Sequence, residues 1–283
     1  FNFCKRVKLK FNNESRLVNI ESISSTGSPL NNESFDWIYN NVKKDLWLIS
    51  LSGGTDVCSG FVGGNPLNSV YRGQIQCRML GVKLESYCDQ GNPLRNHTGE
   101  MVIEKPMPSM PIYFWGDKNN TKYKSSYFEK YQGKWRHGDY IKIFNNGGVE
   151  IFGRSDATLN RGGVRIGTSE VYSCLDKINL VLDALIIYLD KQKRQELVLF
   201  VKLKKGESLT KNIIKNVKNK LKRDYSSFHV PDQIIQVSDI PYTLSGKKME
   251  IPIKNLFMGY SESKTISTGA MKNPTIIKEF SEI

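Results

Sequence analysis

The sequence predicts a mixed α/β fold in two parts: a β-rich region over residues 1–155 and a small α+β domain over 156–283. Short strand patterns separated by glycine and proline fill the first part. A long amphipathic helix pattern, with lysines on its polar faces, appears only in the second part. Strands and helices follow one another there within about 100 residues, which is the size of a small domain.

Apolar strands and glycine turns define the β-rich region. The stretch "DLWLISLSGG" (45–54) predicts a buried strand that ends in a glycine turn, and "TGEMVIEKP" (98–106) and "DYIKIF" (139–144) predict further strands. "NNGGVEIFGRSD" (145–156) predicts a hairpin at the boundary between the two parts. The density of glycine between 53 and 99 indicates backbone that lies close to a ligand or to itself.

Two helices are expected in the second part. "TSEVYSCLDKI" (168–178) is a helix pattern, with Thr168 as its expected N-cap. The stretch 208–225 places four apolar side chains at intervals of four, which is typical of one helix face. These side chains are Leu209, Ile213, Val217 and Leu221.

Three strands accompany these helices. They are expected over 183–190, 195–203 and 232–241, the first two being joined by the polar turn "KQKRQ". The tail after Leu256 is polar, and we expect it to be an appendage on the surface.

Charge and composition limit the classes of function that this protein can have. Of the 283 residues, 39% are hydrophobic, which allows a packed core. The net charge of +13 favours anionic partners such as nucleotides, nucleic acid or an acidic membrane, although it also suits a merely solubilising surface. No apolar run approaches the ~18 residues of a membrane span. Five scattered cysteines indicate reduced thiols in a cytosolic protein, and three separated histidines argue against a zinc site.

Two stretches of the β-rich region could bind a nucleotide. In "SGGTDVCSG" (52–60), N–H groups of Gly53 and Gly54 and the Thr55 hydroxyl can face a phosphate, and Asp56 can hold Mg²⁺. In "WRHGDY" (135–140), Asp139 can accept both hydroxyls of a ribose. Plain tight turns are the alternative for both stretches.

Two stretches of the second part bring positive charge to glycine turns. "FGRSDATLNRGGVRIG" (152–167) holds Arg154, Asp156 and Arg165 around the pair Gly162-Gly163, and arginine suits bidentate contact with phosphate. "PYTLSGKK" (241–248) presents Lys247 on a Ser-Gly turn. It lacks the spacing of a P-loop, and an ordinary surface lysine pair is the alternative.

Taken in order, these four stretches resemble the adenylate-forming superfamily, which includes the acyl-CoA synthetases. Three further stretches are similar to its acetoacetyl-CoA synthetase branch: "GEMVIEKPMPSMPIYFWGD", "YFEKYQGKWRHGDY" and the tail "STGAMKNPTIIKEFSEI". The resemblance implies the C-terminal portion of the large, β-rich adenylate-forming domain over 1–155, followed by a small mobile α+β domain over 156–283. It also implies a ligase that forms a carbon–sulfur bond, with ATP, Mg²⁺ and CoA as cofactors.

The resemblance assigns nucleotide contacts in the large domain. "TGSP" (26–29), with Gly27, Ser28 and Pro29, matches the segment that meets adenine. Thr55 and Asp56 match the threonine and acidic residue near the phosphates and Mg²⁺, where the family usually has glutamate in place of Asp56. Asp139 matches the ribose-binding aspartate, although His137-Gly138 replaces the usual Thr-Gly before it.

The resemblance assigns further contacts in the second part. Arg154 matches the arginine on ribose and phosphate, and Arg165 the arginine near the α-phosphate. Asp156 matches the hinge of the small domain, and Lys247 matches the adenylation lysine. Three residues match the CoA-binding region: Gly162, Gly163 and Lys222.

One departure concerns completeness. The Ser/Thr/Gly-rich phosphate loop that precedes these motifs in the family does not occur in residues 1–50. We therefore expect this chain to be the C-terminal part of a longer synthetase that need not be active alone, with ATP, CoA and a short β-keto acid as substrates. Three alternatives remain open: a synthetase for another short or medium-chain acid, a non-catalytic basic binding module, and, more weakly, a nucleic-acid-binding protein. The oligomeric state is not predicted.

Overall fold

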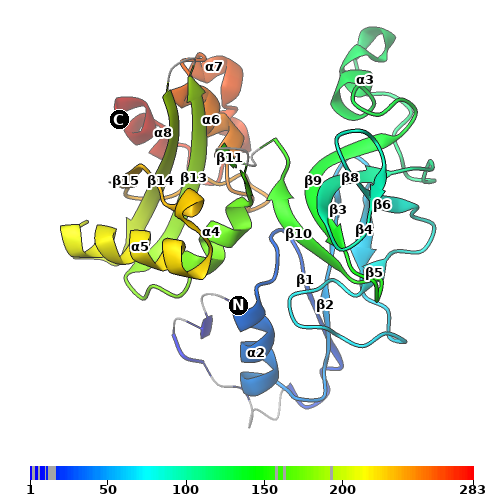
Figure 1. Cartoon of the computed structure of the whole chain (residues 1–283), viewed down its shortest axis with the longest axis horizontal. Helices are drawn as coiled ribbons and strands as arrows, with labels where there is room; N and C mark the ends of the chain where they lie inside the picture. The colour runs from blue at the N-terminus through cyan, green and yellow to red at the C-terminus, as the bar shows by residue number, and fades with distance from the viewer. Residues whose placement is uncertain are drawn as a thin grey trace. The chain divides into compact units, whose positions relative to one another are not determined.

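The computed structural model describes residues 1, 4–5, 7–9, 11, 17–156, 159–161, 164–191 and 194–283. The chain divides into two compact units, Phe1–Ile151 and Phe152–Ile283. Figure 1 follows them from the blue N-terminus to the red C-terminus.

The first unit is β-rich, as the sequence predicts. Its strands are β1 (Ser22–Ser25), β2 (Trp47–Ser50), β3 (Ser52–Gly54), β4 (Ser59–Gly63), β5 (Cys77–Arg78), β6 (Leu84–Tyr87), β7 (Pro93–Leu94), β8 (Thr98–Ile103), β9 (Trp135–Ile143) and β10 (Val149–Arg154), the last of which runs past the end of the unit. They form a parallel pair β1-β2, a sheet of order β3-β4-β5 and a sheet of order β10-β9-β8-β6-β7. The predicted hairpin at 145–156 is confirmed as the β9–β10 turn, in which the Phe144 N–H donates to Gly148 O at 2.9 Å.

Among the described residues of this unit, few helices accompany the strands. They are α2 (Asn32–Asn41), a 3-10 turn η2 (Lys118–Asn120) and α3 (Thr121–Tyr127). The Asn31 side chain caps α2 by accepting the Ser34 N–H at 2.9 Å, and the buried Phe35 and Ile38 of α2 pack with Leu48 of β2. The parallel pair β1-β2 is thereby covered by a helix.

The second unit is built around one three-stranded sheet. Strands β13 (Val181–Lys191) and β14 (Arg194–Leu203) are antiparallel, and β15 (Gln233–Gln236) pairs parallel to β14. A short hairpin, β11 (Leu159–Arg161) with β12 (Val164–Ile166), precedes them. The helices are α4 (Thr168–Leu175), α5 (Lys211–Asp224), α6 (Glu250–Phe257), α7 (Glu262–Thr265) and α8 (Ile276–Glu282), with 3-10 turns η3 (Ser227–His229) and η4 (Thr268–Ala270).

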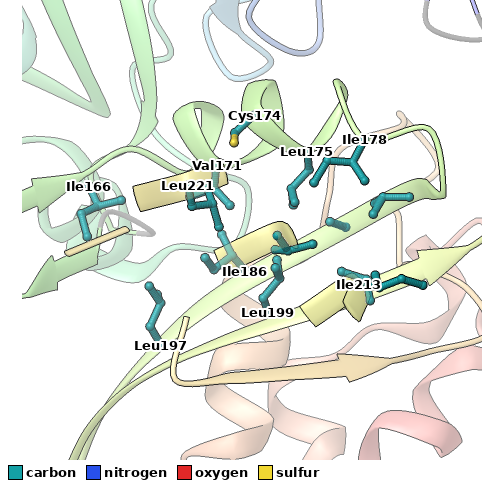
Figure 2. Packing of buried hydrophobic residues seen from close by; sticks show 14 of the residues in the cluster. Ile166, Val171, Cys174, Leu175, Ile178, Ile186, Leu197, Leu199, Ile213 and Leu221 are labelled. Atoms are coloured by element: carbon teal, nitrogen blue, oxygen red, sulfur yellow. The ribbon is translucent and has the colours of Figure 1, made fainter. Parts of the chain in front are cut away.

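Both faces of this sheet are buried. Successive side chains of a strand point to opposite faces, and alternate residues of β13 and β14 belong to two separate buried clusters. Figure 2 shows the first face, where Ile186, Leu197 and Leu199 pack with side chains of α4 and α5. The helix face predicted over 208–225 is confirmed, since Ile213, Val217 and Leu221 of α5 are buried there and Leu209 packs beside them. Lys211, Lys215 and Lys222 of α5 are exposed, away from its buried face.

The prediction that the tail is a surface appendage is wrong. Five of its apolar side chains are buried in the second face of the sheet: Ile266, Met271, Ile276, Ile277 and Phe280. The Phe280 ring lies 4.9 Å from that of Phe200 in β14, measured between centroids. Leu185 and Ile187 of β13 lie on this second face, where side chains of the tail and of α6 pack against them and bury them.

One capping prediction is also wrong. The N-cap of α4 is Gly167, and Thr168 is the first helical residue. The Gly167 N–H donates to the carboxylate of Glu170 at 2.8 Å, so a side chain three residues further on satisfies this end of the helix.

Candidate active site

Two predicted nucleotide-binding segments follow neighbouring parallel strands. In the β1-β2 pair Ser25 lies opposite Ser50, and the Leu51 N–H donates to Ser25 O at 2.9 Å. The exposed segment 26–29 with Gly27, Ser28 and Pro29 follows β1, and the glycine turn follows β2. Because the carboxyl ends of parallel strands meet at one edge, the two segments start side by side, as ligand-binding segments of α/β sheets commonly do.

The glycine turn is the tip of the β3–β4 hairpin. Gly53 lies opposite Gly60, and a Cβ atom on Gly53 would stand 2.1 Å from Ser59 O. The two strands therefore approach too closely for any side chain at Gly53. Thr55 and Asp56 occupy the exposed tip, which the bond from the Cys58 N–H to Thr55 O closes at 3.0 Å.

Asp139 lies in an irregular part of β9. Between the pairs Glu100–Tyr140 and Val102–Arg136, β9 has more residues than β8, so it bulges at 137–139. Gly138 accommodates the bulge with φ +86°. Asp139 is 8% exposed, and its carboxylate lies 3.7 Å from His137 Nε2. A bulge re-aims a side chain, and here it turns the Asp139 carboxylate out of the strand's regular alternation.

The hairpin tip and the bulge lie against each other. The His137 ring contacts Phe61 of β4, with centroids 4.6 Å apart, and a Cβ atom on Gly54 would stand 3.1 Å from His137 Cε1. On the other side the Tyr127 hydroxyl donates to the Asp56 carboxylate. The Tyr127 ring stacks on Trp135 at the start of β9, at 3.5 Å. The structure thus brings Thr55, Asp56 and Asp139 together.

The predicted residues of the second unit are more scattered. Arg154 ends β10, and its Nη2 lies 3.2 Å from the carboxylate of the predicted hinge residue Asp156, with both side chains largely exposed. Arg165 lies in β12, opposite Asn160. Lys222 is exposed in the last turn of α5. Gly162 and Gly163 lie outside the described residues.

Lys247 lies on a tight turn that Thr243 closes. The Thr243 N–H donates to Lys247 O at 2.9 Å, and the Lys247 N–H donates to Thr243 Oγ1 at 3.0 Å. Gly246 takes φ +81°, which few other residues adopt. The Lys247 side chain is exposed, and among the described residues its ammonium has no hydrogen-bond or ion-pair partner. The fold therefore holds the backbone of Lys247 and leaves its charge available.

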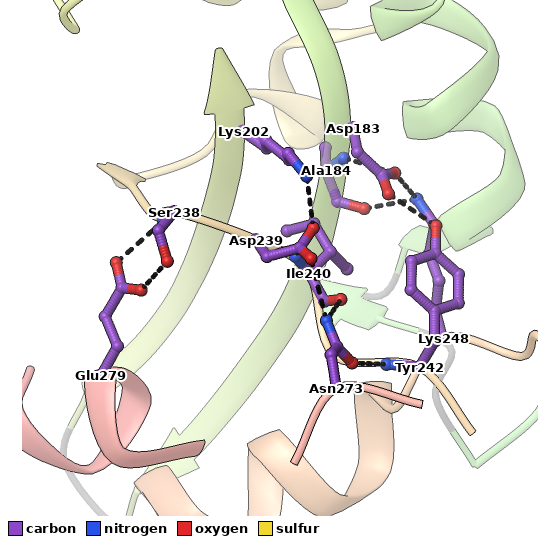
Figure 3. Close-up of polar contacts among 10 residues, drawn as sticks. All are labelled: Asp183, Ala184, Lys202, Ser238, Asp239, Ile240, Tyr242, Lys248, Asn273 and Glu279. Atoms are coloured by element: carbon purple, nitrogen blue, oxygen red, sulfur yellow. Dashed lines mark hydrogen bonds and ion pairs between the residues drawn. The ribbon is translucent and has the colours of Figure 1, made fainter. Parts of the chain in front are cut away.

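Lys248, unlike the exposed Lys247, belongs to a polar cluster that no sequence motif marks (Figure 3). Its Nζ lies 2.7 Å from Asp183 Oδ1 and 4.0 Å from the centroid of the Tyr172 ring, and it donates to Ala184 O. The Tyr242 hydroxyl donates to the other oxygen of Asp183 at 2.6 Å. A charged residue, Asp183, inside an otherwise apolar strand pattern was the available signal.

The cluster continues into α6. The Tyr172 hydroxyl donates to Glu250 Oε1 at 2.6 Å. Burial raises the pKa of the Glu250 carboxyl above its ordinary value, while the hydrogen bonds from Tyr172 and Thr168 and the charge of Lys248 act in the opposite direction. Burial and the neighbouring Glu250 raise the pKa of the Tyr172 phenol well above its ordinary value. Tyr172 is therefore a neutral hydrogen-bond donor in this cluster.

Comparison with known proteins identifies the family. Residues 170–247 match the model of the AMP-binding enzyme C-terminal domain. The acetoacetyl-coenzyme A synthetase of Rhizobium meliloti is 44% identical over 243 residues, which are 86% of this chain and 37% of that protein. Over most of its length the chain is similar to members of the adenylate-forming superfamily. The predicted resemblance is confirmed.

Solved structures of the superfamily agree. The acetoacetyl-CoA synthetase from Streptomyces lividans matches with a TM-score of 0.88 and 39% identity, over 95% of this chain and 41% of that one. A benzoate CoA ligase from Burkholderia xenovorans matches with a TM-score of 0.67 and 22% identity, over 82% and 45% of the two chains, which shows the fold alone. The chain spans about two fifths of the length of the acetoacetyl-CoA synthetases that it matches.

CoA ligases of this superfamily generally use ATP, CoA and Mg²⁺. Among the described residues, no group of three or more His, Cys, Asp or Glu side chains could form a metal cage. Mg²⁺ in nucleotide sites needs only one or two carboxylates besides the substrate phosphates. The exposed Asp56 carboxylate and the Thr55 hydroxyl fit that requirement. In the described part of the chain, no helix is both long and apolar enough to cross a bilayer.

Proposed function

We propose that the full-length protein joins acetoacetate to CoA through an acyl-adenylate. The observation that carries this proposal is the difference in identity. The chain is 44% and 39% identical to two acetoacetyl-CoA synthetases but only 22% identical to a benzoate CoA ligase of the same fold. The acid substrate is thus assigned by similarity, and the chemistry by the residues of the candidate site.

The first step joins the acid to AMP. A carboxylate oxygen of acetoacetate attacks the α-phosphorus of ATP, a new P–O bond forms, and the bond to the bridging oxygen breaks to release diphosphate. Two anions must meet in this step, so cationic groups lower its barrier. Lys247 supplies an exposed ammonium for the α-phosphate, and a lysine acts there as a compact point charge.

The other residues that we assign to the nucleotide each suit the chemistry of a different part of it. The buried carboxylate of Asp139 receives the ribose hydroxyls, and the exposed segment Gly27-Ser28-Pro29 meets the adenine. Gly53, Gly54 and Thr55 lie against the phosphates, and Asp56 holds Mg²⁺, which neutralises phosphate charge when it is bound. Arg154 and Arg165 complete the set as the cations for ribose and α-phosphate.

The second step forms the thioester. The CoA thiol loses its proton to water, its sulfur attacks the acyl carbonyl carbon of the adenylate, a C–S bond forms, and the acyl C–O bond breaks so that AMP leaves with its phosphate oxygen. In this proposal Asp156 is the hinge between a large domain ending at residue 155 and a small mobile domain over 156–283. We assign Gly162, Gly163 and Lys222 to CoA on the resemblance alone, with Lys222 for its 3′-phosphate, and the enzyme acts in the cytosol.

The test is diphosphate release by the full-length gene product with acetoacetate, acetate and butyrate as competing acids. We expect the highest kcat/KM with acetoacetate. Equal or better use of acetate or butyrate would assign the protein to another acid. Absence of diphosphate release with every acid, in a folded protein that binds ATP, would favour a non-catalytic binding module.

A further inference from the structure

The turn that carries Lys247 has two arms, and both are bound to one carboxylate. Tyr242 and Lys248 lie opposite each other across the turn as an antiparallel bridge. The Tyr242 hydroxyl donates to Asp183 Oδ2 at 2.6 Å, and Lys248 Nζ lies 2.7 Å from Asp183 Oδ1. Figure 3 shows both side chains converging on Asp183. Each oxygen of one carboxylate thus holds one arm.

The strand that carries Asp183 is shaped for this contact. The register of β13 against β14 shifts between Val181 and Asp183, which marks a bulge at the start of the strand. The Ala184 N–H donates to Asp183 Oδ1 at 2.8 Å and fixes the carboxylate further. From Ala184 to Leu189 β13 is apolar or aromatic and buried on both faces, so the carboxylate stands at the start of a well-packed strand.

The ammonium of Lys248 has little freedom left. Besides Asp183 it donates to Ala184 O and lies over the Tyr172 ring at 4.0 Å. Its side chain is 22% exposed and that of Asp183 is 24% exposed. A charge pair shielded from water to this degree is stronger than a surface pair. Lys248 therefore differs from the exposed Lys247 beside it, although the sequence shows only two adjacent lysines.

We propose that Asp183 is a positioning residue for Lys247, acting through Tyr242 and Lys248. The inference rests on the proposed function, in which Lys247 acts on the α-phosphate. Loss of the contacts between Asp183 and the side chains of Tyr242 and Lys248 would leave the Lys247 side chain itself unaltered. It would, however, let the turn that carries Lys247 move. Small displacements of a catalytic group can lower a rate by about a hundredfold.

The test is Asp183→Asn in the full-length protein, because this change keeps the size and removes the charge. We expect kcat for adenylation to fall about tenfold to a hundredfold, with the KM for ATP and thioester formation from supplied acetoacetyl-adenylate unchanged. Hydrogen exchange at the Thr243 and Lys247 amides should become faster, since both bonds lie within the turn. Lys248→Met should reproduce both effects, and Lys248→Arg should retain part of the rate because its guanidinium can still pair with Asp183.

The matched control is Asp224→Asn. Asp224 pairs with Lys220 at 3.0 Å on α5, and its side chain is 22% exposed, close to the value for Asp183. We expect adenylation to be unchanged in this variant. Unchanged adenylation or unchanged exchange in Asp183→Asn would overturn the inference, as would an equal loss of both half-reactions. Lys247→Ala is measured beside it: if that variant keeps full adenylation, the proposed role of Lys247 fails instead.

Discussion

In the first unit the Thr55–Asp56 turn is held by backbone contact, whereas in the second unit the Lys247 turn is held by polar side chains beneath it. Gly53 leaves no room for a Cβ atom beside Ser59 O. Around Lys247, by contrast, open space surrounds Gly246, and the turn depends on Thr243, Tyr242 and Lys248. The two turns are expected to carry groups for the same reaction, yet they are stabilised by different means.

This difference predicts different sensitivities. A turn held by close backbone contact loses stability when a glycine gains a side chain, whatever the charge of the new residue. A turn held by polar anchors keeps its backbone but loses its geometry when a charge is removed. Substitutions of each type, placed in each unit, therefore separate stability from positioning.

The tail gives the largest expected effect on stability. Leu244, in the Lys247 turn, donates its N–H to Ala270 O of the tail at 2.9 Å, so the turn depends on a docked tail. Phe280 is 2% exposed against Phe200, and Phe280→Ala should lower the free energy of unfolding by about 3–5 kcal/mol. Urea denaturation measures the change, and Tyr260→Ala in the exposed part of the tail is the control. Equal effects of the two variants would contradict the docked tail.

Lys247→Ala gives the largest expected effect on the reaction. Removing its charge should reduce adenylation about 10²- to 10³-fold, the range for loss of one group that stabilises transition-state charge. Stability should hardly change, because the side chain is exposed. Diphosphate exchange and the thermal midpoint are measured together, with the neighbouring exposed Lys272→Ala as control. Thioester formation from supplied adenylate should survive, and its equal loss would refute the assigned role.

Gly53→Ala should show the opposite pattern to Lys247→Ala, because its primary effect should be a loss of stability. The added Cβ would force the β3–β4 hairpin apart, at a cost of about 1–3 kcal/mol in unfolding free energy. Gly269→Ala is the matched control, since nothing lies within 4 Å of its added Cβ. We expect the control to stay within about 0.5 kcal/mol of the parent. A tolerated Gly53→Ala would show that the two turns do not differ as described.

The sequence predicts the outline of this architecture for identifiable reasons. The spacing of Ile213, Val217 and Leu221 predicts α5, and the apolar runs predict β13 and β14. Within these runs the segments 184–189 and 197–201 are buried at every position, so they require cover on both faces of the sheet. The tail was nevertheless expected on the surface, because its five buried side chains are dispersed among polar ones and show no single period.

The candidate site was predictable only where a motif marks it. Thr55, Asp139 and Lys247 stand in short motifs, whereas Asp183 lies 64 residues before Lys247 in the chain. Its partnership with Tyr242 and Lys248 arises from pairing and a strand bulge, which no local pattern encodes. The bulge that carries Asp139 could not be predicted from the sequence either, since Gly138 is equally typical of a plain turn.

Glu250→Gln gives the smallest expected effect and tests the polar anchors directly. Burial raises the pKa of Glu250 in the folded state above its ordinary 4.5, so the unfolded state releases this proton first as pH rises. The folded state therefore loses stability as pH rises from 4.5 through the raised pKa. Glutamine stays neutral and can still accept the Tyr172 hydroxyl, so the variant should gain up to about 1 kcal/mol at neutral pH and nothing below pH 4.5.

The measurement is urea denaturation of parent and variant on both sides of this window, with the exposed Glu207→Gln as control. The control should show no pH-dependent difference from the parent. A larger gain for Glu250→Gln in acid than at neutral pH would reverse the sign and contradict burial as the dominant influence on this carboxyl. The expected sign, together with reduced adenylation in Asp183→Asn, would separate the roles of two carboxyl groups in one cluster. Ionisation of Glu250 lowers the stability of the fold, whereas the contacts of Asp183 with Tyr242 and Lys248 position Lys247.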